Sequence, residues 1–321
     1  MIMENLMLPK PAHALALVAG GGTMGADVAI VLARAGCRAI VLEPGATRRA
    51  ALDTYFGDTL RKLGLEHKRE RITTCASLDE LDWQAIDLVI ECIPEKLALK
   101  QALFAELVQR ARPDTLLCSN SSSFPISAIG EHLETTGRML GLHFFMPAHL
   151  VPLVEVVLGA NSSGELAESL MTFMRACGMV PVLVRKDLPG FLANRLQHAL
   201  AREAFALIDA GIATAEDVDA AVRFGFGFRF LAAGPVLQRD HAGIDVHCPA
   251  AATMYPSLAA NTTPARVLAQ RYDAGHYGMK TGEGFYRWTP DTIAAERARY
   301  DGLLMAGLRL LAPELPKIED Q

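Results

Sequence analysis

The chain has 321 residues, of which 51% are hydrophobic and 21% are charged, and its formal net charge at pH 7 is −5. This composition is typical of a globular protein that is long enough for two domains and a sizeable core. The negative balance excludes the basic surface that nucleic-acid binding requires, so we expect no nucleic-acid partner. Charges interrupt every apolar stretch before about 18 residues, so we expect no membrane span.

The N-terminal residues lack the apolar segment of a secretory signal peptide. The six cysteines are scattered and form no Cys-x-x-Cys pair. This usage favours a reducing compartment and no disulfides. We therefore expect a cytoplasmic protein.

A glycine-rich turn lies between the first predicted strand and the first predicted helix. An apolar run over 16–19 leads into Gly20-Gly21-Gly22-Thr23-Met24-Gly25, and a helical pattern follows over 26–35. Gly20 permits a tight turn, Gly22 lets the backbone approach a pyrophosphate, and Gly25 lets the helix lie close to the strand. The free N–H groups at the helix start then face the phosphates. The turn, including Thr23 and Met24, is therefore predicted to bind a dinucleotide.

The second predicted strand, over 39–42, ends at Glu43. A carboxylate at this point can accept hydrogen bonds from both ribose hydroxyls. Pro44 and Gly45 follow, with no Arg or Lys directly adjacent. Because a 2′-phosphate would meet a carboxylate and no cation, the sequence predicts NAD rather than NADP.

Strand-like and helix-like patterns alternate as far as residue 184, which predicts a doubly wound, mostly parallel Rossmann sheet. The remaining predicted strands are 72–75, 87–92, 115–119, 139–143, 153–157 and 180–184, and the predicted helices are 47–70, 96–112 and 164–177. After residue 190 the patterns are helical only: a helix over 191–210 precedes one that Thr214 caps through Asp217. We therefore predict an α/β NAD-binding Rossmann domain over 1–187 and an all-helical domain over 188–321.

Polar side chains occur at or near the carboxyl ends of predicted strands, where doubly wound sheets bind ligands. Ser119-Asn120-Ser121-Ser122-Ser123 follows one strand, His143 ends another, and Glu155 stands within an apolar strand. A carboxylate beside an imidazole fixes its tautomer and raises its basicity, as a general base requires. Asn194 opens the first helix of the second domain. Each residue also has a structural interpretation: a turn, a core histidine, a strand-end acid and a helix-surface amide.

These motifs together resemble the 3-hydroxyacyl-CoA dehydrogenase family, from about residue 14 to residue 288. The segments that carry the resemblance are 91–95 with Lys100, 119–123, 141–145, 153–157, 189–195 and Gly278-Met279-Lys280-Thr281-Gly282-Glu283-Gly284-Phe285-Tyr286. The resemblance implies NAD as cofactor, a small-molecule substrate in fatty acid metabolism, and a helical domain that binds substrate and forms a homodimer.

The resemblance also implies roles for individual residues. His143 is implied as the catalytic base and Glu155 as its orienting partner. Ser122 and Asn194 match positions that hydrogen-bond the substrate oxygen. Glu95, Lys100 and Ser122 match positions near the nicotinamide half of the cofactor, and we assign Asn120 to the cofactor site with them.

The sequence departs from the acyl-CoA pattern at several points. Met146 stands where the family usually has Asn, so contacts with cofactor or substrate there must differ. The segment between Glu43 and Asp87 is shorter than the helical insertion that helps the acyl-CoA enzymes bind CoA. Residues 148–153 and 226–235 are more similar to the branch that contains gulonate dehydrogenase, lambda-crystallin and carnitine dehydrogenase, whose enzymes oxidise small 3-hydroxy acids.

The sequence therefore predicts an NAD-dependent oxidoreductase that oxidises a secondary alcohol of the 3-hydroxyacyl-CoA type to a ketone. The alternatives are a dehydrogenase of a small gulonate- or carnitine-like 3-hydroxy acid or of a hydroxyalkyl aromatic acid, and a non-catalytic crystallin-like protein that binds NAD. For a carboxylate substrate, Arg229 is the candidate clamp, because its planar fork matches two carboxylate oxygens. The structural interpretation of Arg229 is a surface arginine at the end of a helix.

Two further histidines invite comparison with a metal site. His241 and His247 lie near Asp240 and Asp245. Their spacing fits no common ligand motif, and hydride transfer with a histidine base needs no metal. We therefore expect no metal.

Overall fold

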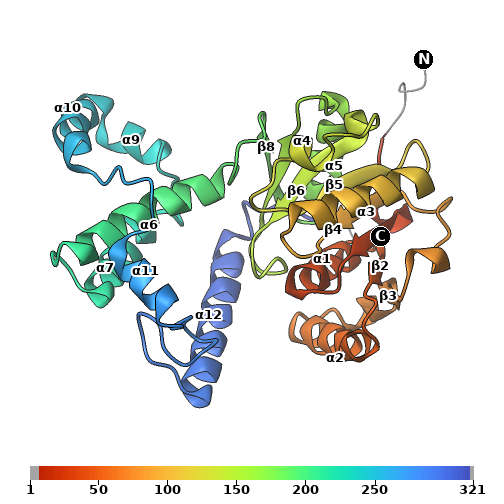
Figure 1. Ribbon diagram of the computed structural model, residues 1–321, viewed down its shortest axis with the longest axis horizontal. Coiled ribbons are helices and arrows are strands. Elements are labelled where there is room, and N and C mark those ends of the chain that lie inside the picture. Colours follow the sequence, from red (N-terminus) through yellow and green to blue (C-terminus); the bar gives the residue numbers. More distant parts are fainter. Residues whose placement is uncertain (1–6, 319–321) are drawn as a thin grey trace. The chain divides into compact units, whose positions relative to one another are not determined.

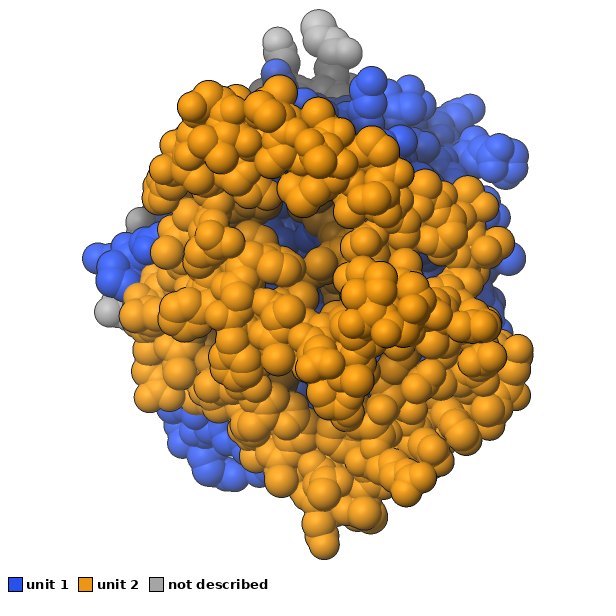
Figure 2. Space-filling view, turned by 90° about the vertical axis from the view of Figure 1, so that its left-hand side faces the viewer, with its two compact units in different colours: residues 1–194, 313–321 blue, residues 195–312 orange. Residues whose placement is uncertain are grey.

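The computed structural model describes residues 7–318, and the chain divides into two compact units (Figures 1 and 2). The first unit comprises residues 1–194 and 313–321, and the second comprises residues 195–312. The second unit is therefore an insertion whose two ends both continue into the first. No helix of residues 7–318 is long and apolar enough to cross a membrane.

The first unit is built on one eight-stranded sheet in the order β3-β2-β1-β4-β5-β6-β7-β8. The strands are β1 (Leu15–Ala19), β2 (Arg38–Leu42), β3 (Ile72–Cys75), β4 (Leu88–Glu91), β5 (Leu116–Ser119), β6 (Met139–Phe144), β7 (Leu153–Leu158) and β8 (Val180–Val184). All neighbours are parallel except β6 and β7. The connection over 145–152 contains no crossover helix, which parallel pairing would need. The predicted doubly wound, mostly parallel sheet is confirmed.

Helices cover both faces of this sheet (Figure 1). They are α1 (Thr23–Arg34), α2 (Ala46–Lys62), α3 (Leu97–Arg110), α4 (Ile126–Ile129) and α5 (Gly164–Ala176), with 3-10 turns η1 (Pro11–His13), η2 (Glu66–Arg71), η3 (Leu78–Glu80) and η4 (Thr136–Arg138). Ala16 and Val18 of β1 belong to the core formed with α1, α2 and α5. Leu15 and Leu17 belong to the core formed with α3 and α4. Because both faces of these strands are buried, their sequences are continuous apolar runs.

The helix predicted over 47–70 is shorter in the structure. α2 ends at Lys62, and the separate turn η2 follows it. Gly64 has φ +70°, a left-handed conformation that commonly ends helices because glycine has no Cβ. The prediction missed this stop signal inside a polar, helix-compatible stretch.

The second unit is helical. It contains α6 (Ala193–Asp209, whose first two residues belong to the first unit), α7 (Ala215–Ala221), the π-helical segment η5 (Val222–Phe226), α8 (Gly227–Arg229), α9 (Leu237–Ala242), α10 (Ile244–Met254), η6 (Tyr255–Ser257), α11 (Arg266–Asp273) and α12 (Pro290–Leu311). Thr214 and Asp217 form a reciprocal capping box at α7, as predicted. Large apolar side chains of this unit are exposed, among them Phe224 (70%) and Phe228 (67%).

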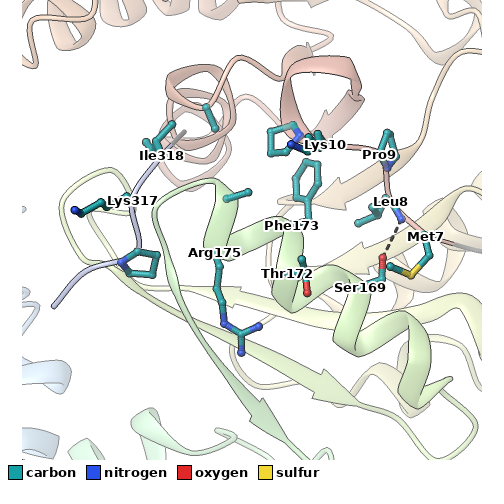
Figure 3. Close-up of a pocket in the computed structure, with 14 residues that line it drawn as sticks. Met7, Leu8, Pro9, Lys10, Ser169, Thr172, Phe173, Arg175, Lys317 and Ile318 are labelled. Carbon is teal, nitrogen blue, oxygen red and sulfur yellow. Dashed lines mark hydrogen bonds between the residues drawn. The ribbon is translucent and has the colours of Figure 1, made fainter. Parts of the chain in front are cut away.

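The last described residues of the chain return to the first unit. Residues 316–318 line a cavity of about 340 Å³ together with residues 7–11 and α5 (Figure 3). The N–H of Leu8 donates to Oγ of Ser169 at 2.9 Å beside it. None of the predicted cofactor- or substrate-binding residues lines this cavity. The predicted site residues therefore lie away from this cavity.

Candidate active site

The glycine turn forms an open cradle between β1 and α1. Gly20 has φ +116°, which explains the need for glycine there. A Cβ on Gly25 would lie 1.9 Å from the carbonyl oxygen of Gly20, so only glycine lets α1 begin this close to the strand. A Cβ on Gly22 would have one neighbour within 4 Å, at 4.0 Å, the guanidinium of Arg48. The backbone is therefore open where a dinucleotide pyrophosphate needs it, at the N-terminus of α1, and the residues fit NAD.

The acid that follows β2 has a cation beside it. Oε1 of Glu43 accepts from the Gly45 N–H at 2.9 Å, and Nε of Arg48 lies 3.5 Å from Oε2. The same Nε donates to the Gly21 carbonyl oxygen at 2.8 Å. Arg48 was not predicted, because it is not adjacent to Glu43 in sequence and lies in the first turn of α2.

A buried ion pair anchors the end of β4. Nζ of Lys100 lies 2.7 Å from Oε1 of Glu91, and the two side chains are 1% and 0% exposed. Oε2 of Glu91 accepts from the Ser119 hydroxyl at 2.6 Å, which ties β4 to β5. Nζ of Lys100 also lies 3.1 Å from Oε2 of Glu95. Glu91 was not predicted as a site residue, although an acid ending an apolar strand was an available signal.

The carboxylate of Glu95 organises the serine cluster that follows β5. Oε1 accepts from the Ser121 hydroxyl (2.7 Å), the Ser122 N–H (3.1 Å) and the N–H and hydroxyl of Ser123 (2.9 and 2.6 Å). Burial alone would raise the pKa of Glu95, but the bonds from Ser123 and Ser121 and the charge of Lys100 lower it to about 2. A depressed carboxylate pKa stabilises the fold above the ordinary Glu value, and this contribution is lost as pH falls toward 2. The turn that holds Ser122 is therefore fixed by an anion at neutral pH.

His143 and Glu155 form a buried pair across the antiparallel strands β6 and β7, where they are register partners. Nδ1 of His143 lies 2.7 Å from Oε2 of Glu155, and the side chains are 5% and 0% exposed. The other oxygen, Oε1, accepts from the N–H groups of Leu192 (3.0 Å) and Ala193 (2.8 Å) at the start of α6. An Nδ1–H that donates to the carboxylate leaves Nε2 with its lone pair free.

Phe191 shapes this pair and was not predicted. It has φ +47°, a conformation that costs energy for a residue with a side chain. Its ring meets the His143 imidazole edge to face, with centroids 5.5 Å apart, and Phe145 packs on the imidazole at 4.5 Å. The strained residue therefore packs on the imidazole while the next two N–H groups bind Glu155.

A buried carboxylate on α1 holds the connection that follows the histidine strand. Asp27 is 0% exposed; Oδ2 accepts from the Ala148 N–H at 2.9 Å, and Oδ1 lies 3.0 Å from Nδ1 of His149. Tyr55 of α2 donates a short hydrogen bond to Oδ1. The 145–152 connection is thus fastened to the helix that begins at the glycine cradle. Asp27 was not predicted, although an acid in an otherwise apolar helix pattern was an available signal.

The structure brings most of the predicted site residues into the first unit. Oδ1 of Asn120 accepts from the Phe144 N–H at 2.8 Å, so this amide joins the serine turn to the histidine strand. Asn194 is the second residue of α6, directly after the N–H groups that bind Glu155. Met146 lies in the 145–152 connection and is 64% exposed. Arg229 lies on α8 of the second unit and is not part of this set.

No group of three or more His, Cys, Asp or Glu side chains within residues 7–318 is placed to hold a metal ion. The polar side chains at the carboxyl edge of the sheet instead form hydrogen-bonded pairs. One of these pairs holds His143 through Nδ1 and leaves its Nε2 free, and the dinucleotide cradle lies beside it. Such a fold and site define an NAD-dependent dehydrogenase that acts on CH–OH groups.

Comparison with known proteins shows the family to which this dehydrogenase belongs. Residues 16–188 match the model of the 3-hydroxyacyl-CoA dehydrogenase NAD-binding domain, and residues 190–288 match that of the 3-hydroxyacyl-CoA dehydrogenase C-terminal domain. The chain belongs to the 3-hydroxyacyl-CoA dehydrogenase family.

Individual relatives differ in what they act on. The 5-formyl-3-hydroxy-2-methylpyridine 4-carboxylate 5-dehydrogenase of Mesorhizobium japonicum is 31% identical over 290 residues, which is 88% of this chain and 94% of that protein. The human mitochondrial hydroxyacyl-coenzyme A dehydrogenase is 33% identical over 286 residues, 84% of this chain and 90% of that one.

The similar solved structures include the same two kinds of dehydrogenase. A crystal structure of the same kind of pyridine-carboxylate dehydrogenase, described as an NAD⁺-dependent dismutase, superposes with a TM-score of 0.86 at 29% identity and covers 93% of this chain and 98% of that chain. The 3-hydroxybutyryl-CoA dehydrogenase of Escherichia coli gives 0.70 at 31% identity, covering 86% of this chain and 59% of that one.

The buried Lys100–Glu91 pair yields a stability prediction. Lys100→Met leaves Glu91 as an uncompensated buried charge, so we expect the free energy of unfolding to fall by about 3–5 kcal/mol in urea titrations. The double variant Glu91→Gln/Lys100→Met should recover part of this loss. Lys62→Met, at an exposed lysine of α2, is the matched control. Equal stability of Lys100→Met and Lys62→Met would contradict the interpretation.

Proposed function

We propose that this enzyme oxidises the CH–OH group of a small aromatic acid, a ring that carries a carboxylate near a hydroxymethyl or hydrated formyl group. The observation that carries the proposal is the similarity to the pyridine-carboxylate dehydrogenase, which extends over nearly all of both chains with a TM-score of 0.86. Acyl-CoA oxidation is the second candidate, because the human acyl-CoA relative is 33% identical. That candidate would place the enzyme in fatty acid metabolism.

The connection between β2 and β3 favours the small acid. It consists of α2 and the short turn η2, without the longer helical insertion that the family resemblance associates with CoA binding. Met146 supports the same conclusion, because a thioether is a poor hydrogen-bonding partner where the family usually has an amide. Neither difference alters the His143–Glu155 pair.

In the proposed mechanism, Nε2 of His143 accepts the proton of the substrate hydroxyl. Glu155 holds Nδ1–H and stabilises the imidazolium that forms, while its second oxygen is held by α6. Ser122 and Asn194 hydrogen-bond the substrate oxygen as its charge changes. NAD held at the glycine cradle would supply the acceptor for the hydride that leaves the same carbon. An aldehyde reacts as its hydrate, which presents the same CH–OH unit.

The cofactor side of the proposal uses the cradle and the acids of the carboxyl edge. Gly20, Gly22, Thr23, Met24 and Gly25 would hold the pyrophosphate at the start of α1. Glu43 would bind the adenosine ribose. Around the nicotinamide half, Glu95, Lys100 and Asn120 would act mainly by positioning, since their side chains already bind the serine turn, Glu91 and the Phe144 N–H.

We further propose that the first unit is the NAD-binding domain expected over 1–187 and that the helical unit is the substrate and dimerisation domain, expected over 188–321, of a homodimer. The two compact units divide at residue 194, and residues from 313 onward belong to the first unit. The helical unit supports the proposed dimer because its large apolar side chains, such as Phe224 and Phe228, are exposed. Large apolar side chains that are exposed in one subunit are typical of an interface between subunits.

The base assignment predicts the effect of two substitutions. His143→Gln should lower turnover at least ~10²-fold, the usual contribution of a general base. Glu155→Gln should also slow turnover, because the neutral amide stabilises the imidazolium less. Single-turnover measurement of NADH formation, with NADH binding measured separately, tests both. Near-normal turnover of His143→Gln with intact NADH binding would show that another group is the base.

The substrate class is tested by comparing a pyridine or benzene acid that bears a hydroxymethyl group with gulonate, carnitine and 3-hydroxybutyryl-CoA. If Arg229 clamps the carboxylate, Arg229→Met should raise KM for the preferred acid by about tenfold to a hundredfold, the value of a charge-assisted hydrogen bond, and leave NADH affinity unchanged. An acyl-CoA substrate would instead use exposed basic residues such as Lys62 to meet the CoA phosphates. Efficient oxidation of 3-hydroxybutyryl-CoA that ignores Arg229 but is weakened by Lys62→Ala would therefore establish the acyl-CoA function.

The assembly prediction is tested by light scattering at micromolar concentration. We expect a mass twice that of the 34.6 kDa chain. Replacing Phe224 with Asp should shift the mass toward the monomer if its exposed ring lies in the interface, whereas Leu99→Asp, at an exposed position of the first unit, should not. A monomeric wild type would refute the proposed dimer.

A further inference from the structure

The guanidinium of Arg48 lies at the edge of the dinucleotide cradle and is held there by two contacts. Its Nε donates to the Gly21 carbonyl oxygen at 2.8 Å and lies 3.5 Å from Oε2 of Glu43. Its NH2 group lies 4.0 Å from where a Cβ of Gly22 would stand. A cation therefore borders both the acid that reads the ribose and the open backbone that receives the pyrophosphate.

The other arginines of α2 do not share this position. Nη1 of Arg49 donates to the carbonyl oxygens of Glu43 and Pro44, each at 2.7 Å. Arg61 lies near the far end of the helix and pairs with Asp58 at 2.8 Å. Arg48 has a side chain that is 54% exposed, so its donors remain accessible to a ligand.

In dinucleotide-binding folds, an acid after the second strand selects the free ribose of NAD, whereas a nearby arginine accommodates the 2′-phosphate of NADP. This chain has both groups, 3.5 Å apart. We propose that Arg48 is a second determinant of cofactor selectivity. Its guanidinium is able to bind a 2′-phosphate, but Glu43 holds this cation in an ion pair.

Glu43 then disfavours NADP in two ways. Its charge repels the 2′-phosphate directly, and its pairing with Arg48 removes the cation that would receive that phosphate. Replacing Glu43 with a neutral residue should remove both effects together. The affinity gained for NADPH should therefore depend on Arg48, which simple loss of repulsion would not require. The inference concerns cofactor binding alone and does not rest on the proposed substrate.

The test is a double-mutant cycle on the full-length protein, read by fluorescence titration with NADPH and NADH. We expect Glu43→Gln to tighten NADPH binding at least about tenfold, and Arg48→Met in that background to remove most of the gain, since a charge-assisted phosphate contact is worth about tenfold or more. Arg48→Met alone should leave NADPH binding weak. Glu43→Gln/Arg61→Met, which removes the same charge at the far end of α2, should keep the gain.

The decisive comparison is between Glu43→Gln and Glu43→Gln/Arg48→Met. Equal NADPH affinity of these two variants would overturn the proposal, as would failure of Glu43→Gln to bind NADPH more tightly. NADH binding and thermal unfolding of each variant verify that the cradle is folded. Glu43→Gln/Arg48→Lys provides a second measurement that retains the charge without the planar fork, and an intermediate NADPH affinity is expected from it.

Discussion

Burial of carboxylates at the carboxyl edge of the sheet is the constraint on which the site depends. Glu91 and Glu155 are both 0% exposed, and a buried carboxylate is tolerated only if donors satisfy its oxygens. Glu91 obtains Lys100, the Ser119 hydroxyl and the Ile93 N–H. Glu155 obtains His143 and two backbone N–H groups at the start of α6. Each requirement joins segments that are far apart in the chain.

The same requirement gives the site its rigidity. Glu155 uses one oxygen for His143 and the other for α6. Rotation of the imidazole would therefore leave the buried carboxylate of Glu155 without one of its partners. Phe191 at φ +47° is kept in an unfavourable conformation by this arrangement, as strained residues at functional sites commonly are. An imidazole fixed in orientation before substrate arrives suits the base proposed for this site, because little reorganisation is left to undergo during proton transfer.

The features that show the family and the features that support the proposed substrate lie in different parts of the molecule. The cradle, the Glu91–Lys100 pair and the His143–Glu155 pair lie on or beside the sheet, in the domain that the family model covers over 16–188. The features that favour a small acid, namely Met146, the short β2–β3 connection and Arg229, lie outside the sheet. In the proposed function, the scaffold thus carries the chemistry, and its connections and the helical unit carry the specificity, a common division in such folds.

The sequence alone determined the order of strands and helices, the glycine turn and the residue types at the carboxyl edge, because these follow from local periodicity and from the glycines that a tight turn requires. It predicted His143 beside Glu155 through family resemblance. Arg48 beside Glu43, Asp27 beneath the 145–152 connection, and Lys100 between two carboxylates were decided by tertiary structure alone. The spacing in sequence carries no signal for such contacts, since each arises where separate helices and strands pack together and buried charges must find partners.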